Sequence, residues 1–436
     1  MRLAVIGLGH VGLPTAGVLA HLGHEVSAVD VDEEKIELLQ RGIFPFFEPE
    51  LEDLVRQGVE AGRLTFSQWI EDAVSGVGVA FLCVGTPPNG AGQANLSIIE
   101  AAAAQLAESV DGPLVVVEKS TVPAGTAERI AQTLQRHRPD GVFAVVSNPE
   151  FLREGSAVKD SIRPSRILVG SDDPEALATM RELYAPLVEA GVPWIETDLR
   201  TAELAKHASN AFLALKVSYA NALARICEAA GADVSAVAQI MGADSRIGRG
   251  HLSAGIGFGG YCLPKDVQAF EHLSRQLGYD FPLLREIARI NDEAMDAGFR
   301  KIQEALWNLT GKRVAVLGLA FKPNTDDTRF SPALELSRRL IEAGADVVGY
   351  DPEAGTNAKA EVSQLEVVGD VYSALEGAHC AVLATDWDEF RTLDLVRVRE
   401  LMRFPILVDG RNLFDSQEVR AAGITYIPTG RPPVRP

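Results

Sequence analysis

Residues 257–266, GFGGYCLPKD, bring together side chains suited to covalent chemistry. Cys262 follows three closely spaced glycines, and such backbone freedom is expected where a chain must approach a ligand closely. Lys265 and Asp266 come directly afterwards, and a nearby cation lowers the pKa of a thiol toward the reactive thiolate. Cys262 is therefore predicted to be a nucleophile.

The remaining cysteines lie inside apolar stretches, where packing in a core is the better interpretation; they are Cys83, Cys227 and Cys380. The four cysteines form no CxxC pair, so neither a disulfide framework nor a thiolate metal site is indicated. The eight histidines show no HxxxH spacing, and we expect no metal site. Free thiols favour a reducing compartment, so the cytoplasm is the expected location.

A second chemical signal is the turn GLGHVG, which follows an apolar run at the start of the chain. Its glycines, Gly7, Gly9 and Gly12, have the spacing that allows a tight turn, close approach to a pyrophosphate and packing of a helix on a strand. A second run ends at Asp30, which would bind ribose hydroxyls and repel a 2′-phosphate. NAD is therefore the expected cofactor, with a glycine turn that binds nothing as the alternative. The expected contacts also include His10, Val11 and Lys35.

Two further turns follow the presumed fourth and fifth strands, in the sequences CVGTP and KSTVP. Thr86, Ser120 and Thr121 lie in these turns and could line the nicotinamide half of the groove. On position alone, a purely structural role for these turn residues is equally favoured.

These segments must be positioned by strands and helices, and the chain has three parts. From Leu3 to about Ile195, short β-branched runs alternate with helical stretches, which predicts a parallel sheet covered on both faces and a ligand site at its carboxyl edge. From Thr201 to about Arg300 the pattern is helical, beginning with a helix of about 28 residues and about 40 Å that ends near Gly231. From Lys312 the strand pattern returns. The predicted fold class is α/β, with two Rossmann-like doubly wound domains joined by a central helical domain with a long connecting helix.

The two α/β parts resemble distant copies of one unit. RLAVIGLG and HEVSAVDVD are echoed by RVAVLGLA and ADVVGYDP. The glycine spacing is not repeated, because Gly318 is followed by Leu319, Ala320 and Phe321. The dinucleotide site is therefore expected in the first copy.

Composition excludes several classes of function. The chain has 436 residues, a formal net charge of −19 and a pI of about 4.9, which disfavour binding to nucleic acid and to anionic membranes. It has no apolar run near the roughly 18 residues that a membrane-spanning helix needs. Its N-terminus, MRLAVIGLG, moves directly into a strand and a turn without a cleavage site.

Eight stretches in order make the chain similar to the nucleotide-sugar 6-dehydrogenase family, in its UDP-glucose branch: GLGHVGLP, GTPP, STVPAGT, SNPEFLREGSA, LAKHASNAF, GFGGYCLPKD, GLAFKPNTDDTR and DGRN. The resemblance covers essentially the whole chain. It implies an NAD-dependent twofold oxidation of the C6 alcohol of UDP-glucose to the carboxylate of UDP-glucuronate. It also implies an NAD-binding domain over residues 1–200, a helical dimerisation domain over 201–300 and a UDP-sugar-binding domain over 301–436.

The same resemblance implies roles for individual residues. The Cys262 thiolate would add to the aldehyde as a thiohemiacetal, which is oxidised again to a thioester that water hydrolyses. Glu150 and Thr121 would move a proton through water, Lys206 would stabilise an oxyanion with Asn210, and Asp266 would act as acid and base. His207, next to Lys206, is interpreted as a packing or surface residue. The expected substrate contacts are Glu150, Phe151, Leu152, Glu154, Lys206, Asn210, Arg246 from a neighbouring subunit, Ser253, Gly259, Lys322 and Arg411, and Lys265, Arg329 and Glu154 are expected at the cofactor.

Three alternatives remain open. The same chemistry could act on UDP-N-acetylmannosamine or GDP-mannose, because no residue reads the sugar C2 substituent from first principles. A hydroxyacid dehydrogenase shares the first domain and following helices, but the C-terminal domain and the Cys262 motif argue against it. A catalytically silent NAD- or nucleotide-sugar-binding module is disfavoured by Cys262, Lys206 and Asp266 occurring together. The expected partner is a second copy of the chain, as a homodimer or higher oligomer through the central helices.

Overall fold

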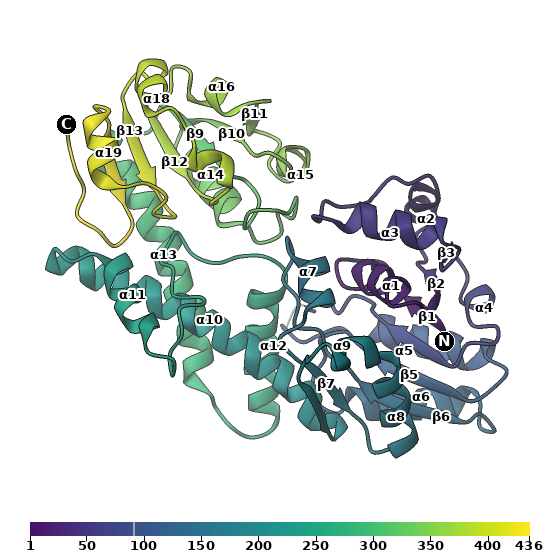
Figure 1. Ribbon diagram of the computed structural model, residues 1–436. Coiled ribbons are helices and arrows are strands. Elements are labelled where there is room, and N and C mark those ends of the chain that lie inside the picture. The colour runs from purple at the N-terminus through teal and green to yellow at the C-terminus, as the bar shows by residue number, and fades with distance from the viewer. Residues whose placement is uncertain (90–91) are drawn as a thin grey trace. The chain divides into compact units, whose positions relative to one another are not determined.

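The computed structural model describes residues 1–89 and 92–436 of the chain. They form two compact units, Met1–Ser209 and Asn210–Pro436, each with one β-sheet covered by helices (Figure 1). The predicted α/β class is confirmed, with a Rossmann-like sheet in each unit and a helical stretch between the two sheets along the chain.

The sheet of the first unit has eight strands in the order β3-β2-β1-β4-β5-β6-β7-β8. The strands are β1 (Arg2–Ile6), β2 (Glu25–Val29), β3 (Leu64–Ser67), β4 (Val79–Leu82), β5 (Leu114–Glu118), β6 (Phe143–Ser147), β7 (Ile167–Gly170) and β8 (Trp194–Thr197). The helices are α1 (Gly12–His21), α2 (Glu33–Gln40), α3 (Leu51–Glu60), α4 (Ile70–Ala73), α5 (Ser97–Ser109), α6 (Thr126–His137), α7 (Ala157–Ile162), α8 (Pro174–Leu183) and α9 (Ala185–Glu189).

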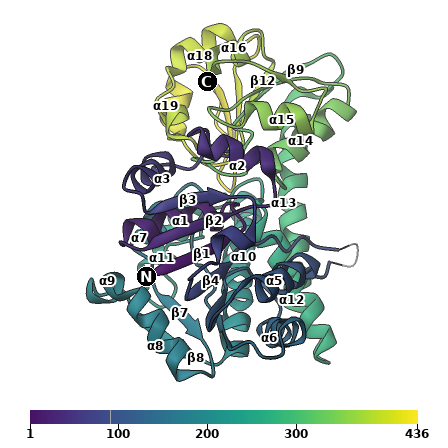
Figure 2. The same ribbon diagram turned by 90° about the vertical axis from the view of Figure 1, so that its right-hand side faces the viewer.

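Both faces of this sheet are buried, which explains the continuous apolar runs of its strands. In β1, Leu3 and Val5 pack with one group of core side chains, and Ala4 and Ile6 pack with another on the opposite face. Helices α5 and α6 lie side by side over the second face (Figure 2). The carboxyl ends of the parallel strands therefore present their turns at one edge of the sheet.

Strand β7 departs from the expected parallel arrangement, because it pairs antiparallel with β6 at Ser147 and Gly170. The other neighbouring strands are parallel. A parallel neighbour requires a crossover, usually a helix that packs across the sheet. The β6–β7 connection, which the structure describes throughout, contains only the six-residue helix α7.

The long helix α10 (Leu199–Ala230) confirms the helix expected from Thr201 to Gly231. Its 32 residues begin two positions earlier than predicted, and the helix stops before Gly231, whose φ is +71°. Helices α11 (Val234–Ala243), α12 (Cys262–Gln276) and α13 (Pro282–Leu306) follow along the chain.

The second unit contains a six-stranded parallel sheet in the order β11-β10-β9-β12-β13-β14. The strands are β9 (Arg313–Leu317), β10 (Asp346–Tyr350), β11 (Glu366–Val367), β12 (Cys380–Leu383), β13 (Ile406–Asp409) and β14 (Thr425–Pro428). The helices around it are α14 (Pro332–Glu342), α15 (Gly355–Glu361), α16 (Val371–Leu375), α17 (Asp388–Arg391), α18 (Leu395–Leu401) and α19 (Ser416–Ala421).

Within residues 1–89 and 92–436, none of the helices combines the length and the apolar character needed to cross a bilayer.

Candidate active site

The glycine-rich turn joins β1 to α1 and has a shape that fits a dinucleotide. Gly7 has a φ of +92°, and a Cβ added at Gly12 would lie 1.7 Å from the Gly7 carbonyl oxygen. A Cβ added at Gly9 would meet nothing within 4 Å, so this side of the turn is open. Helix α1 begins at Gly12 with no side-chain cap from Val11. The Leu13 N–H donates to the Gly9 carbonyl at 3.1 Å and Pro14 has no N–H, so among the first three residues of the helix the Gly12 N–H is the one that remains for a phosphate oxygen.

Asp30 lies directly after β2 and is hydrogen-bonded to the glycine turn. Its Oδ2 accepts hydrogen bonds from the Leu8 N–H and from Lys35 Nζ, both at 2.8 Å, and its Oδ1 accepts one from the Asp32 N–H at 3.1 Å. Acceptor capacity remains on Oδ1 for a ribose hydroxyl. His10, inside the turn, stacks on Phe46 with ring centroids 4.2 Å apart.

The hydroxyls expected near the nicotinamide contact backbone carbonyls. Thr86 Oγ1 donates to the Thr121 carbonyl at 3.0 Å, and Ser120 Oγ donates to the Val84 carbonyl at 2.8 Å. These bonds tie the turn after β4 to the turn after β5. Their structural role is thus visible, and their contact with a cofactor stays a prediction.

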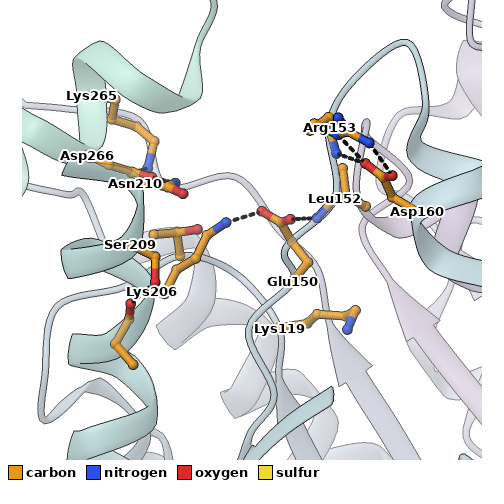
Figure 3. Close-up of polar contacts among 12 residues, drawn as sticks. Lys119, Glu150, Leu152, Arg153, Asp160, Lys206, Ser209, Asn210, Lys265 and Asp266 are labelled. Atoms are coloured by element: carbon orange, nitrogen blue, oxygen red, sulfur yellow. Dashed lines mark hydrogen bonds and ion pairs between the residues drawn. The ribbon is translucent and has the colours of Figure 1, made fainter. Parts of the chain in front are cut away.

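A buried ion pair joins the turn after β6 to α10. Lys206 Nζ lies 2.9 Å from Glu150 Oε1, while Glu150 Oε2 accepts the Leu152 N–H at 2.7 Å (Figure 3). The ring of Phe151 lies under the Arg166 guanidinium, 3.5 Å from its carbon to the ring centroid. Burying both charges is tolerable because each neutralises the other.

A cavity of about 60 Å³ opens beside this pair. Its lining includes Lys119, whose Nζ donates to the side chain of Asn148 at 3.1 Å. Glu154, expected at both ligands, is buried in the same loop. This loop thus gathers four of the expected substrate contacts, which are Glu150, Phe151, Leu152 and Glu154.

In the second unit, Asn210, Lys265 and Asp266 form a buried cluster. Asp266 Oδ2 accepts a hydrogen bond from Asn210 Nδ2 at 2.6 Å, and Asp266 Oδ1 pairs with Lys265 Nζ at 2.6 Å (Figure 3). The carboxylate is therefore held in one orientation by a charged and a neutral donor.

Cys262 is the first residue of α12 and is partly exposed, whereas Cys83, Cys227 and Cys380 are buried as expected. Burial raises the pKa of Cys83 and of Cys380 to about 12, which keeps these two thiols protonated. The N-terminus of a helix favours an anion, and Cys262 is the cysteine with that position and with access to solvent.

The glycines before Cys262 have a different cause from the one expected. A Cβ at Gly259 would lie 2.0 Å from the Phe330 carbonyl oxygen, and one at Gly260 would lie 2.5 Å from the Phe321 ring. The two glycines therefore allow the chain to pack against its own 321–330 loop. Packing within the chain is thus enough to require glycine at both positions, and the contact of Gly259 with the substrate stays a prediction.

Two arginines of the second unit, Arg329 and Arg411, are held in fixed positions. Arg329 forms a bidentate pair with Asp327 at 2.8 and 2.6 Å and lies over the Tyr261 ring at 4.5 Å. Arg411 Nε donates to the Ala384 carbonyl at 2.7 Å, and its NH1 donates to the Gly257 carbonyl at 3.3 Å. Burial lowers the pKa of the Arg411 guanidinium.

The remaining expected residues are less constrained. Lys322 Nζ lies 5.4 Å from the centroid of the Phe321 ring. Arg246 has a largely exposed side chain that pairs with Asp244, and Ser253 is exposed. Arg246 and Ser253 are not placed in the buried Asn210–Asp266 cluster.

Four residues that hold these loops were missed by the sequence analysis. Glu48 accepts the N–H groups of Gly155 and Ala157, each at 2.7 Å. Two buried asparagines, Asn221 and Asn291, bind the segment before Cys262, and Glu203 binds the segment after Thr121. No local pattern could have found these residues, because each lies far along the chain from the loop that it binds; they are Glu48, Glu203, Asn221 and Asn291.

Three family models match the chain in succession. They describe the UDP-glucose/GDP-mannose dehydrogenase family: its NAD binding domain at residues 1–188, its central domain at residues 200–293 and its UDP binding domain at residues 315–416.

Individual relatives match over nearly the whole length. UDP-glucose 6-dehydrogenase TuaD of Bacillus subtilis is 43% identical, with 100% of this chain and 94% of the relative covered. Among solved structures, a UDP-glucose dehydrogenase from Pyrobaculum islandicum has a TM-score of 0.91 at 38% identity, covering 98% of this chain and 96% of that one. The UDP-D-ManNAc dehydrogenase from Pyrococcus horikoshii has a TM-score of 0.87 at 31% identity, with 99% of each chain covered. Because the three domain models match in order and the relatives match over nearly the whole chain, this chain belongs to the UDP-glucose/GDP-mannose dehydrogenase family.

Proposed function

We propose that this chain is an NAD-dependent UDP-glucose 6-dehydrogenase that oxidises the C6 alcohol of UDP-glucose twice to give UDP-glucuronate. The observation that carries the proposal is the partly exposed Cys262 at the start of α12, four residues before the buried Asp266 and its partners. A single oxidation of an alcohol needs no thiol. A covalent thiol adduct is what allows an aldehyde to be oxidised again without being released.

The first oxidation removes a hydride from C6 and a proton from its hydroxyl. NAD, when bound, would accept one hydride in each oxidation, so two NAD molecules would be used in succession. The Glu150 carboxylate receives the proton through a water that Thr121 binds, and the Lys206 ammonium stabilises the negative charge that develops on the oxygen. The Lys206–Glu150 distance of 2.9 Å supports this assignment, since the pair places an acid–base group beside a cation.

The second oxidation requires the cysteine. The Cys262 thiolate adds to the aldehyde carbon, and the carbonyl oxygen takes a proton, which gives a thiohemiacetal. Loss of a second hydride from C6 and of the hydroxyl proton leaves a thioester. Water then adds to the thioester carbon with Asp266 as general base, the C–S bond breaks, and the thiol and a carboxylate are released. Lys265 and Asn210 hold Asp266 for this role.

Each ligand is assigned its own set of contacts. The cofactor is held by the glycine turn with His10 and Val11, by Asp30 and Lys35, and by Thr86, Ser120, Thr121, Glu154, Lys265 and Arg329. The UDP-sugar is held by Glu150, Phe151, Leu152, Glu154, Lys206, Asn210, Ser253, Gly259, Lys322 and Arg411, with Arg246 from a neighbouring subunit. Arginine suits the diphosphate because its planar fork binds two oxygens at once. The proposed domains are residues 1–200 for NAD, 201–300 for dimerisation and 301–436 for the UDP-sugar.

We also propose that two copies associate through α10. Phe212, Tyr219 and Ile226 are 61%, 51% and 63% exposed and recur every seven residues, so they form one apolar stripe along the helix. An exposed apolar stripe of this length suits a second copy with the same stripe. Replacing Tyr219 and Ile226 with glutamate is expected to yield monomers in analytical ultracentrifugation, and unchanged dimers would exclude this surface.

Four free cysteines with no disulfide among them support a cytoplasmic location. Location would be tested by fractionation of cells that produce the chain, with activity expected in the cytoplasmic fraction. Recovery of the activity outside the cytoplasm would contradict it.

The decisive experiment measures stoichiometry with UDP-glucose, UDP-N-acetylmannosamine and GDP-mannose as candidate substrates. We expect two NADH for each UDP-glucose consumed and lower kcat/KM for the other two sugars. One NADH with free aldehyde would overturn the mechanism, and a preference for either other sugar would replace the substrate.

Cys262→Ser is expected to lower the formation of UDP-glucuronate by about 1,000-fold or more, because a serine hydroxyl is a far weaker nucleophile than a thiolate. Cys227→Ser is the matched control, since Cys227 is a buried thiol on α10. Normal turnover of Cys262→Ser would remove the nucleophile from the mechanism.

A further inference from the structure

Two buried side chains of α10 are hydrogen-bonded to the backbone of the segment that follows Thr121. Glu203 Oε2 accepts the Gly125 N–H at 2.6 Å, and Glu203 Oε1 accepts the Ala127 N–H at 2.7 Å. His207 Nε2 lies 2.9 Å from the Val122 carbonyl oxygen, so this nitrogen carries the proton and donates. Glu203 and His207 are four residues apart and therefore share one face of the helix.

The beginning of α6 depends on this contact. The residue before α6 is Gly125, which has a φ of +92° and no side chain with which to cap the helix. Glu203 supplies the cap from 76 to 78 residues away, with one oxygen for each of two N–H groups. The position of the Thr121–Ala127 segment is thus set by α10 and not by the segment itself.

The same turn of α10 carries the lysine proposed to stabilise the oxyanion. Lys206 precedes His207 and reaches Glu150 at 2.9 Å. At the start of the segment, the Thr121 carbonyl accepts a hydrogen bond from the Thr86 hydroxyl. One turn of α10 therefore positions both Lys206 and the loop that carries Thr121. A shift of Glu203 or His207 would move this loop and change the distance between Thr121 and Lys206.

We propose that Glu203 and His207 are positioning residues that fix the Thr121 hydroxyl relative to Lys206 and Glu150 for the proton transfer of the first oxidation. The proposal rests on the proposed function, because it assigns Thr121 to that proton transfer. Neither Glu203 nor His207 touches substrate in this scheme. Each acts through the backbone of the loop, at Val122, Gly125 and Ala127.

The ionised carboxylate is required because both of its oxygens are then acceptors, so the activity of the variants is compared above pH 8, where Glu203, whose pKa burial raises to about 7, is ionised. Glu203→Gln has nearly the same shape, but its amide nitrogen would face a backbone N–H donor, so one of the two bonds is lost. At the other residue, His207→Gln keeps a donor for the Val122 carbonyl, whereas His207→Leu removes it. These pairs separate a loss of hydrogen bonding from a change of size.

The test is a double-mutant cycle between Glu203→Gln and Thr121→Ala, with kcat for UDP-glucose oxidation as the readout. We expect Glu203→Gln alone to lower kcat about 10-fold or more while KM for both ligands changes less than about 2-fold, since an interaction made in the transition state is affected. In the Thr121→Ala background Glu203→Gln should have almost no further effect, because the group that it positions is absent. Fully additive losses, or a loss confined to KM, would overturn the proposal.

Glu48→Gln is the matched control, because Glu48 is a buried glutamate that binds two N–H groups of another loop. It should speed hydrogen exchange at the amides of residues 155 and 157 and leave exchange at residues 125 and 127 unchanged, because it loosens the other loop alone. If Glu203→Gln does not fold, the comparison of His207→Leu with His207→Gln replaces it, with kcat lowered in the first and restored in the second. Equal activity of these two variants would contradict the role of His207.

Hydrogen exchange at the amides of residues 125 and 127 separates this proposal from the proposed function. Exchange should be faster in Glu203→Gln whatever reaction the chain catalyses. A wild-type enzyme that fails to release two NADH would contradict the proposed function. Unchanged exchange at these amides in Glu203→Gln would contradict the positioning role of Glu203.

Discussion

Two glycine turns, one in each unit, begin with the same geometry. Gly7 has a φ of +92° and Gly318 a φ of +88°. The next residue in each turn donates its N–H to an aspartate after the neighbouring strand: Leu8 to Asp30 at 2.8 Å and Leu319 to Asp351 at 2.6 Å. The two halves of the chain therefore share a strand–turn–strand scaffold.

The segments after these two turns differ. In the first unit the chain enters α1 shortly after Gly9, at Gly12. In the second unit Ala320 is fully buried, and α14 does not begin until Pro332. The intervening loop, residues 321–331, contacts the second turn, because the Ser331 hydroxyl donates to the Leu319 carbonyl at 2.7 Å.

The aspartates differ in the same way. Asp30 retains acceptor capacity, whereas Asp351 accepts the N–H groups of Leu319, Ala320, Glu353 and Ala354 together with the Trp387 indole N–H. A ligand has no access to a carboxylate that is saturated by its own protein. The same turn is therefore suited to a dinucleotide only where a helix N-terminus and an open glycine come directly after it.

The largest effect is expected for Gly12→Ala. Its Cβ would lie 1.7 Å from a backbone oxygen, so α1 must move away from β1. We expect NAD affinity to fall at least about 100-fold, which corresponds to about 2.7 kcal/mol, with a lower melting temperature. Calorimetric titration and thermal unfolding measure the two effects, and normal NAD affinity would show that the turn does not bind the cofactor.

The next largest effects are expected for the two aspartates, Asp351 on stability and Asp30 on NAD affinity. Asp351→Ala leaves buried N–H groups without an acceptor and should lower the free energy of unfolding by about 2–4 kcal/mol with NAD affinity unchanged. Asp30→Ala should weaken NAD binding about 10- to 100-fold. Urea unfolding and calorimetry of both variants test the contrast, which fails if Asp351→Ala weakens NAD binding as Asp30→Ala does.

The first unit also has a predicted response to pH. Burial raises the pKa of Glu203 to about 7 from 4.5, although the N–H groups of Ala127 and Gly125 lower it. Because the folded pKa is the higher one, the stabilising contribution is complete below pH 4.5 and is lost as the pH rises through about 7. Glu203 also interacts electrostatically with three other charged groups, which are Glu118, Glu128 and Arg200.

Between pH 5 and 8 we expect Glu203 to account for a fall of about 2–3 kcal/mol in the free energy of unfolding. Urea unfolding of the wild type and of Glu203→Gln over this range isolates the effect as the difference between the two curves. A difference that does not change with pH would show that Glu203 is already ionised in the folded chain at pH 5.

The smallest effect sharpens the comparison most directly. Gly9→Ala gives the first turn the residue that the second turn has at Ala320. A Cβ at Gly9 meets nothing within 4 Å, so stability should not change, but NAD affinity should fall about 10-fold because the pyrophosphate must approach this atom. The reverse change, Ala320→Gly, should cost about 0.5–1 kcal/mol of stability and create no NAD affinity. Unchanged NAD affinity of Gly9→Ala would contradict close approach at this glycine.

Features that depend on neighbouring residues were predictable from the amino-acid sequence. The turn at Gly7–Gly12 and the helix that stops before Gly231 belong to this group, because spacing and local propensity decide them. The buried state of Cys83, Cys227 and Cys380 followed from their apolar surroundings.

Features that depend on distant contacts were set by tertiary packing. One such feature is the antiparallel pairing of β7 with β6. Others are the packing of Gly259 and Gly260 against the 321–330 loop and the hydrogen bonds of Glu203 to two distant amides. Each of these contacts joins segments whose separation along the chain leaves no periodic signal. Local residue patterns carry the chemistry, whereas the partners that hold it in place are chosen by which surfaces the folded chain buries together.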